Sequence, residues 1–329
     1  MASQPVENLK VVALAGGVGG ARLSDGLAQL LPPANLTVVV NTGDDFEHLG
    51  LLISPDLDTV CYTLAGLANP STGWGRSGET WTVMESLEAL GGPGWFRLGD
   101  RDLATHLERT RRIREGQSLS EITRAFCKAW DVAVRVLPMS NDRVATQVLT
   151  TQGVLPFQDY FVRQRCEPQV SGFVFQGIER ASPAPGVLEA LQAADVVVIC
   201  PSNPWVSIDP ILKLPGIRAT IEIKAVLAVS PIIAGQAVKG PAAKMYRELG
   251  VQPSAKAVAL HYGSRAYSGL LSGFVMDRKD ADQVSDLTAI DLDVLTTKTL
   301  MLDASTRRKL AEDVLALAKK ILPATSEAR

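Results

Sequence analysis

The sequence lacks several features that mark special classes of protein. Only four of its 329 residues are cysteines and they form no CxxC pair, which excludes a disulfide scaffold and argues against a structural zinc site. The 33 Lys and Arg residues are balanced by 35 Asp and Glu residues, so the chain is not built mainly to coat nucleic acid. Its apolar runs fall short of the roughly 18 residues of a membrane helix, and its first residues are not those of a signal peptide. We therefore expect a cytoplasmic protein with reduced thiols that binds neither nucleic acid nor a membrane.

The order of apolar runs predicts an α/β fold. Two short runs typical of buried parallel strands, residues 11–15 and 36–40, flank a helical pattern at 21–31. Such a strand–helix–strand unit places its strands parallel and side by side. A second alternation predicts helices at 187–193, 242–249 and 306–322 and strands at 195–200, 224–229 and 255–260. We therefore predict a Rossmann-like, mostly parallel sheet flanked by helices, with a helical insertion or cap.

The middle of the chain interrupts this alternation. Its first part has helical spacing, and its second part is strand-like, with alternating apolar residues at 157–163 and 172–175. We predict one domain, residues 1–329, with an α/β nucleotide-binding core at 10–55 and 186–325, a helical insertion at 56–131 and a strand-rich segment at 132–185.

A glycine-rich turn at residues 16–20 joins the first strand to the first helix. Glycines there allow a tight turn and let the backbone approach an anion at the helix N-terminus. The turn is not a Walker A loop, and Arg22 stands where a dinucleotide fingerprint has its third glycine. We interpret Gly17, Gly19 and Gly20 as facing a phosphate or nucleotide rather than serving packing alone. Arg22 either adds charge to this site or is a surface arginine.

Acidic residues follow the second strand. Asn41 precedes Asp44 and Asp45, at a strand end where ligands bind in open α/β sheets. This turn fits a solvated loop, a ribose-binding aspartate or a divalent-metal site. Asp56 and Asp58 bring the total to four aspartates in fifteen residues, more than capping explains, although Asp58 alone is a good N-cap candidate. Beside an anion-binding loop, the cluster favours a metal site that faces phosphates.

Three tryptophans lie close together in sequence. Trp74 stands between two glycines, an unusual setting for a core residue, and its indole offers a flat face to a planar ligand. For Trp81 and Trp95, packing is the favoured interpretation.

Two polar loops follow later strands and are further candidates. Asn203 and Ser207 lie in the first loop, and Ser230 begins the second, which leads to Lys239 before a helix. Each loop is as readily structural as ligand-facing. We interpret the arginine-rich stretch at residues 109–114 as a solvated helix face.

A set of motifs occurs in a fixed order from about residue 10 to 320. In sequence they are Gly16-Gly17-Val18-Gly19-Gly20-Ala21-Arg22, the Asn41–Asp45 turn, Pro55-Asp56-Leu57-Asp58-Thr59, Gly73-Trp74-Gly75 with Glu79-Thr80-Trp81, the stretch Leu98–Leu107, the Pro201–Ile208 loop and Ser230–Gly235. Each motif is weak alone. The ordered set closely resembles the 2-phospho-L-lactate transferase family, called CofD in archaea and FbiA in actinobacteria.

That resemblance implies a step in the biosynthesis of coenzyme F420. The donor is lactyl-2-diphospho-5'-guanosine or, in bacterial members, enolpyruvoyl-2-diphospho-5'-guanosine. The family moves the phospholactyl or phosphoenolpyruvyl group to 7,8-didemethyl-8-hydroxy-5-deazariboflavin, which gives coenzyme F420-0 or its dehydro form and GMP. The family requires Mg2+. The resemblance also implies a homodimer that acts on small-molecule substrates.

The resemblance also implies roles for the candidate residues. Asp44, Asp45 and Asp58 are the catalytic candidates, and Asp44 and Asp58 are expected to hold Mg2+. Trp74 is expected to stack near the deazaflavin ring while the terminal ribityl hydroxyl attacks the distal phosphorus. The candidate substrate-binding residues are Gly17, Gly19, Gly20, Arg22, Asn41, Trp74, Asn203, Ser207, Ser230 and Lys239. The acid on the donor, the general base and the loop that reads guanine stay open.

Two other functions compete with the transferase. A YvcK-like regulator that binds nucleotide sugars typically has three successive glycines and an Asp-Asp-Gly-Gly-Ser turn, whereas Val18 interrupts the glycines here and Phe46 follows the two aspartates. An NAD(P)-dependent oxidoreductase is disfavoured by Arg22 and by the clustered aspartates. The transferase therefore stands as the main prediction.

Overall fold

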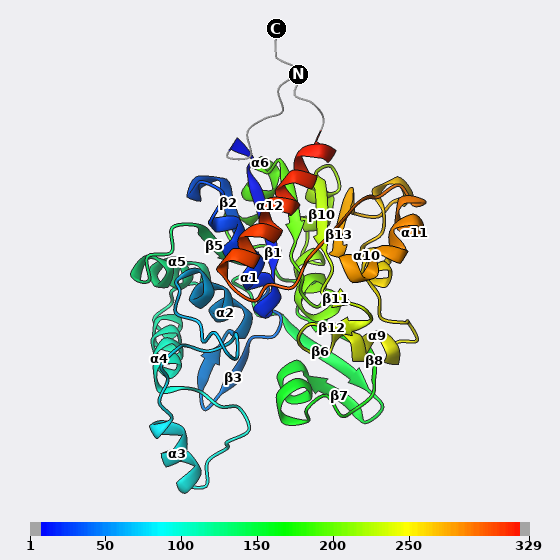
Figure 1. The fold of residues 1–329 in the computed structure, drawn as a ribbon. Coiled ribbons are helices and arrows are strands. Elements are labelled where there is room, and N and C mark those ends of the chain that lie inside the picture. The colour runs from blue at the N-terminus through cyan, green and yellow to red at the C-terminus, as the bar shows by residue number, and fades with distance from the viewer. Residues whose placement is uncertain (1–7, 323–329) are drawn as a thin grey trace.

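A seven-stranded parallel sheet lies at the centre of the computed structural model, which describes residues 8–322 (Figure 1). Its strands are β1 (Val11–Ala15), β2 (Leu36–Val40), β5 (Arg135–Pro138), β9 (Val196–Ile199), β10 (Ala225–Val229), β13 (Gly273–Asp277) and β14 (Asp293–Thr297). The order is β14-β13-β10-β9-β1-β2-β5, and every neighbouring pair is parallel. Since β2 and β9 flank β1 on opposite sides, the strand order reverses at β1. Ligands of open α/β sheets bind beyond the carboxyl ends of strands at such a point.

Helices and short strands surround this sheet. The helices are α1 (Gly17–Ala28), α2 (Pro55–Leu64), α3 (Thr82–Ala89), α4 (Asp100–Arg114), α5 (Leu119–Ala129), α6 (Val187–Ala193), α7 (Asp209–Leu212), α8 (Ile217–Ile221), α9 (Ala242–Glu248), α10 (Ala255–Tyr262), α11 (Val284–Thr288) and α12 (Ala304–Ile321). The short strands are β3 (Phe46–His48) paired with β4 (Leu51–Ile53), β11 (Ile232–Ile233) paired with β12 (Gln236–Ala237), and a small sheet of β6 (Ala145–Thr150), β7 (Gly153–Pro156) and β8 (Val170–Gln176). Within residues 8–322, no helix has both the length and the apolar character to cross a membrane.

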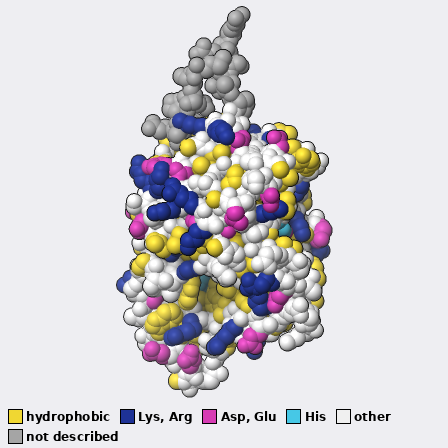
Figure 2. Space-filling model, turned by 45° about the vertical axis from the view of Figure 1, so that its right-hand side comes forward, with side chains coloured by type: hydrophobic (Ala, Val, Ile, Leu, Met, Phe, Trp, Pro, Cys, Tyr) yellow, Lys and Arg dark blue, Asp and Glu magenta, His cyan; other side chains and the backbone are white. Residues whose placement is uncertain are grey.

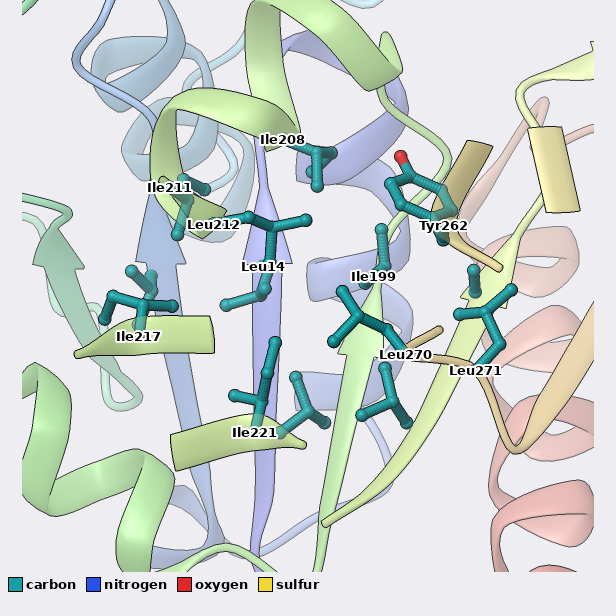
Figure 3. Packing of buried hydrophobic residues seen from close by; sticks show 14 of the residues in the cluster. Leu14, Ile199, Ile208, Ile211, Leu212, Ile217, Ile221, Tyr262, Leu270 and Leu271 are labelled. Carbon is teal, nitrogen blue, oxygen red and sulfur yellow. The ribbon is translucent and has the colours of Figure 1, made fainter. Parts of the chain in front are cut away.

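Apolar clusters cover both faces of the central sheet, and strand β1, which is apolar throughout, contributes side chains to both. Successive side chains of a strand point to opposite faces. Ala13 therefore packs in the cluster that holds α1 and α12, whereas Leu14 packs in the cluster that holds α6, α8 and α10. Figure 3 shows Leu14 and Ile199 of adjacent strands among Ile211, Ile217 and other apolar residues of the second cluster. The sheet thus forms a rigid floor whose strand ends carry the polar loops.

The predicted fold class is confirmed, but two local predictions are wrong. Residues 255–260 belong to helix α10, because the Ser254 hydroxyl accepts a hydrogen bond from the backbone N–H of Ala257 and caps an alanine-rich segment with high helix propensity. Residues 157–163 form a helical turn rather than a strand. Phe157 and Phe161 lie one turn apart there and stack on each other, which an alternating pattern did not predict. The division of the chain into core, insertion and strand-rich segment stays a prediction.

Candidate active site

A cavity of about 580 Å³ opens beyond the carboxyl ends of the central strands. Of the predicted site residues, it brings together Gly17, Gly19, Arg22, Asp44, Asp58, Trp74, Asn203, Ser207, Ser230 and Lys239. The other three, Gly20, Asn41 and Asp45, are not part of its wall. Figure 2 shows that the lower half of the molecule is hollowed, with hydrophobic side chains inside the hollow and Lys and Arg side chains around it.

The glycine loop lines this cavity and approaches its neighbours closely. Gly17 begins α1 with a φ of 60°, a left-handed conformation that favours glycine. A side chain at Gly19 would overlap the carbonyl oxygen of Pro201. The Ser202 hydroxyl accepts from the N–H of Gly16 and donates to its carbonyl oxygen, at 3.2 and 2.8 Å. The loop after β9 therefore fixes the glycine loop, and the first turn of α1 faces the cavity with N–H groups that lack helical partners.

Asn41 joins the two acidic segments. Its Nδ2 donates to Asp44 Oδ1 at 2.7 Å and to Asp56 Oδ2 at 3.0 Å, and its Oδ1 accepts from the N–H of Gly43 at 2.8 Å. Asn41 is fully buried, so its polar atoms orient the carboxylates from behind. Asp56 was counted in the predicted acidic cluster but was not among the candidate site residues, yet it lines the cavity and accepts from the N–H of Gly17. Its position in the same short motif as Asp58 was the signal for it.

The carboxylates are crowded and short of positive charge. Burial raises the pKa of Asp44 well above its ordinary value, and the charges of Asp56 and Asp45 raise this pKa further. Burial also raises the pKa of Asp45 well above its ordinary value and the pKa of Asp56 to about 6. Oδ1 of Asp45 and Oδ2 of Asp58 are buried without hydrogen-bond partners. Such a set of oxygen donors fits a divalent cation.

The raised pKa of Asp56 predicts that the metal-free protein gains stability as the pH falls. Because the folded-state pKa, about 6, exceeds the unfolded value of 3.8, this stabilisation is complete below pH 3.8 and is lost as the pH rises through 6. From pH 7 to pH 5, we expect Asp56 to add about 1 kcal/mol to the free energy of unfolding. Urea unfolding with a chelator present would measure this in the wild type and in Asp56→Asn. Equal pH dependence in both proteins would contradict the prediction.

Asp58 is held differently from Asp44. It lies in the first turn of α2, whose N-cap is Ser54, so the interpretation of Asp58 as the cap is wrong. Arg109 of α4 donates to Asp58 Oδ1, and His106 Nδ1 lies 3.6 Å from Asp58 Oδ2. Arg109 is buried, so the interpretation of residues 109–114 as a solvated face is wrong for this arginine. Only the fold brings α2 and α4 together, which is why sequence spacing gave no signal for the pair.

Arg22, Arg97 and Lys239 bring positive charge to the cavity wall. In the part of the chain that the structure describes, none of them forms an ion pair with a carboxylate. Arg22 donates to the carbonyl oxygen of Met301 at 2.7 Å, and Lys239 donates to that of Thr72. Burial lowers the pKa of Lys239, and the nearby charge of Arg22 lowers it further. Two adjacent cations without a carboxylate suit an anionic ligand such as a phosphate.

Aromatic side chains form another part of the wall. Trp74 is 49% exposed and lines the cavity on the loop that Lys239 contacts. Phe157 and Phe161 also line it, with ring centroids 5.4 Å apart and ring planes within 5° of parallel. This stacked pair was not among the predicted site residues. The cavity therefore offers two aromatic surfaces for a planar ligand.

Loops after β9 and β10 complete the wall. Asn203 caps the helical turn that follows it, since its Oδ1 accepts from the N–H of Trp205 at 3.1 Å. Ser207 lies against the glycine loop, where it would block a side chain at Gly16. The Ser230 hydroxyl closes its own turn by donating to the carbonyl oxygen of Ile232 at 2.9 Å. The side chains of all three residues thus shape the cavity by contacting nearby backbone.

By its fold the chain is a Rossmann-like α/β protein, with a glycine loop, buried carboxylates and unpaired cations around one cavity. These features suit an enzyme that acts on phosphorylated substrates. The family model described as 2-phospho-L-lactate transferase CofD matches residues 11–306, and the chain belongs to this family. The predicted enzyme class, a transferase of coenzyme F420 biosynthesis, is thereby confirmed.

Individual relatives agree with this family. A Streptomyces griseus protein named phosphoenolpyruvate transferase is 46% identical over 320 residues, which cover 95% of this chain and 99% of that relative. A Thermobifida fusca protein of the same name is 47% identical over 289 residues, 84% of this chain and 88% of that relative. Among solved structures, a UPF0052 family member from Bacillus halodurans matches with a TM-score of 0.60 at 17% identity, covering 93% of this chain and 99% of that one. This last likeness supports the fold alone.

Proposed function

We propose that the enzyme moves a phosphoenolpyruvyl group from enolpyruvoyl-2-diphospho-5'-guanosine to 7,8-didemethyl-8-hydroxy-5-deazariboflavin, giving dehydro coenzyme F420-0 and GMP. The observation that carries this choice of donor is the near full-length identity of 46% to a relative named phosphoenolpyruvate transferase. Lactyl-2-diphospho-5'-guanosine is the second candidate donor, because the family itself is described as 2-phospho-L-lactate transferase.

In this proposal the cavity holds both substrates. The N–H groups at the start of α1, with Arg22 and Lys239, bind the donor phosphates. The ribityl hydroxyl oxygen bonds to the phosphorus that carries the enolpyruvyl group, and the bond from that phosphorus to the bridging oxygen breaks. GMP leaves with the bridging oxygen and its electron pair, and the hydroxyl proton passes to a carboxylate of the acidic cluster. Catalysis of this kind is mainly positioning and charge stabilisation.

Asp44 and Asp58 would hold Mg2+, directly or through water, with Asp56 beside them. The ion supplies positive charge that offsets the charge of the phosphates. The protein contributes the hydrogen bonds of Asn41, which fix Asp44 and Asp56 relative to each other. It also contributes the ion pair that fixes Asp58.

The proposal is tested with purified protein, Mg2+, the deazaflavin and each candidate donor. Mass spectrometry follows the deazaflavin product and GMP. A product mass that carries the enolpyruvyl group supports the proposal, whereas product from the lactyl donor alone would replace the donor. No product from either donor, with tight binding of a nucleotide sugar or NAD, would favour a regulator or a dehydrogenase.

Replacing Trp74 by alanine is expected to raise the KM for the deazaflavin about tenfold, because an aromatic stacking contact is lost. The KM for the donor should change little, since the cations and the glycine loop are untouched. Steady-state kinetics with each substrate varied in turn would measure both values. Phe161→Ala is the matched comparison: a rise in that variant with none in Trp74→Ala would move the stacking surface to the phenylalanine pair.

Other parts of the function stay predictions from the sequence and from the resemblance. These are the identity of the metal as Mg2+, the binding of the guanosine diphosphate group, the homodimer and the cytoplasmic location. Metal analysis after dialysis tests the identity of the metal, and sedimentation of the purified protein tests the homodimer.

A further inference from the structure

Arg109 is an unusual residue for the helix that carries it. Within residues 8–322 it is one of the largest fully buried side chains, and it is 2% exposed. Arg111 and Arg112 on the same helix instead pair with Glu108 near the surface, at 2.8 and 2.6 Å. A buried ion pair is costly to desolvate, and apolar residues often pack as well in its place. We therefore infer that residue 109 is an arginine because its charge is used, and not because its side chain fills space.

The guanidinium of Arg109 is fixed on several sides. One terminal nitrogen donates to Asp58 Oδ1. The other donates to the carbonyl oxygen of Leu52 at 3.3 Å and contacts His106 Nδ1 at 3.2 Å. The ring of Phe126 in α5 lies 6.0 Å from the guanidinium carbon. Contacts from β4, α2, α4 and α5 thus hold one side chain in one orientation.

The partner carboxylate lies between Arg109 and the cavity. Asp58 lines the cavity, whereas Arg109 is not part of the wall. Oδ1 of Asp58 accepts from Arg109, and Oδ2 is buried without a hydrogen-bond partner. Arg109 thus lies behind Asp58 and binds one of its oxygens, while the other lies 3.6 Å from His106 Nδ1.

A second carboxylate is tied to the same arginine through His106. Since His106 Nδ1 faces an Arg109 N–H, we assign the ring proton to Nε2, which lies 3.4 Å from Asp102 Oδ1. The Tyr62 hydroxyl donates to the same Asp102 oxygen at 2.7 Å. Asp58, Asp102 and His106 lie close enough together to resemble a metal site. Both carboxylates of this group already accept a hydrogen bond, Asp58 from Arg109 and Asp102 from Tyr62, and these bonds hold Asp58 in place.

We propose that Arg109 is a positioning residue for the transfer reaction, because it fixes the orientation of the Asp58 carboxylate at the cavity wall. The inference rests on the proposed function. Arg109 acts on the enzyme with its substrates bound. Without Arg109 the Asp58 carboxylate rotates and turnover falls. The substrates still bind to the glycine loop and to the aromatic side chains of the cavity wall. Misplacing a catalytic group by about 1 Å costs about 100-fold in rate.

Two variants separate positioning from stability. Arg109→Lys keeps the charge but loses the planar fork, so we expect kcat to fall about 100-fold with each KM within about threefold of the wild type and the melting temperature little changed. Arg109→Ala leaves a space for a guanidinium ion, so millimolar guanidinium should restore at least about tenfold in kcat and should not help Asp58→Asn. Arg112→Ala is the matched control on the same helix, with kcat near the wild-type value.

Each result has a defined meaning. A folded Arg109→Lys with kcat near that of the wild type overturns the inference, and so does a folded Arg109→Ala that guanidinium does not rescue. If Arg109→Ala does not fold, Arg109→Lys alone decides the question. Absence of transfer in the wild-type protein, assayed in parallel, would overturn the proposed function instead.

Discussion

Replacing Asp44 by asparagine is expected to lower kcat/KM by about 1,000-fold, a larger loss than we expect from Trp74→Ala or Arg109→Lys. The new side chain keeps the shape of Asp44 and can still accept from Asn41, but it removes one negative charge from the cluster that would hold the metal. Burial and then the neighbouring carboxylates raise the pKa of Asp44, so a bound cation would favour the charged form of this side chain. Initial rates at limiting Mg2+ measure the loss in turnover.

A direct measurement of metal binding separates this effect from a change in fold. Titration with Mn2+, followed by electron paramagnetic resonance, should show weaker binding in Asp44→Asn than in the wild type. Asp282→Asn removes a charge from an exposed position and serves as the matched control. Turnover near the wild-type rate in Asp44→Asn at limiting Mg2+ would remove Asp44 from the metal site.

The sequence predicted well those features that depend on residues close together in the chain. The first strand and the first helix follow one another within 18 residues, from Val11 to Ala28, and the structure confirms both elements. The helix begins earlier than predicted, at Gly17, so most of the predicted glycine turn is its first turn. Position at a strand end was also informative. Because all central strands are parallel, loops that follow β1, β2, β9 and β10 must meet at one edge, and the cavity is found there.

Features that depend on distant parts of the chain were missed. Arg109 meets Asp58 across 51 positions, and nothing in an arginine-rich helix distinguishes the one residue that turns inward. The stacked Phe157 and Phe161 were missed for a different reason. Their segment alternates in polarity over too few residues to separate a strand from a helical turn. In the fold, Phe157 packs in a cluster with Val206 and Met245, which are distant in sequence.

The backbone contact at Gly19 leads to the second large expected effect, that of Gly19→Ala. Gly19 lies in α1 with ordinary helical geometry, where alanine is normally favoured by about 1 kcal/mol. Here the added methyl group would overlap the carbonyl oxygen of Pro201, a backbone atom that cannot turn away alone. We expect a net loss of about 2 kcal/mol in the free energy of unfolding and at least about a 100-fold loss of kcat/KM.

The loss of activity should exceed what the loss of stability explains, because the loop after β9 touches both the glycine loop and the cavity. If Pro201 retreats, the Ser202 hydroxyl no longer holds both polar atoms of Gly16, and the phosphate-facing turn loses its support. Urea unfolding and donor kinetics on the same sample measure the two losses separately. Gly172→Ala is the control, since its added methyl group meets only a Leu149 carbon at 3.4 Å and should leave both quantities near wild type. If Gly19→Ala binds the donor as tightly as the wild type does, the close approach at Pro201 serves packing, and the phosphates bind elsewhere in the cavity.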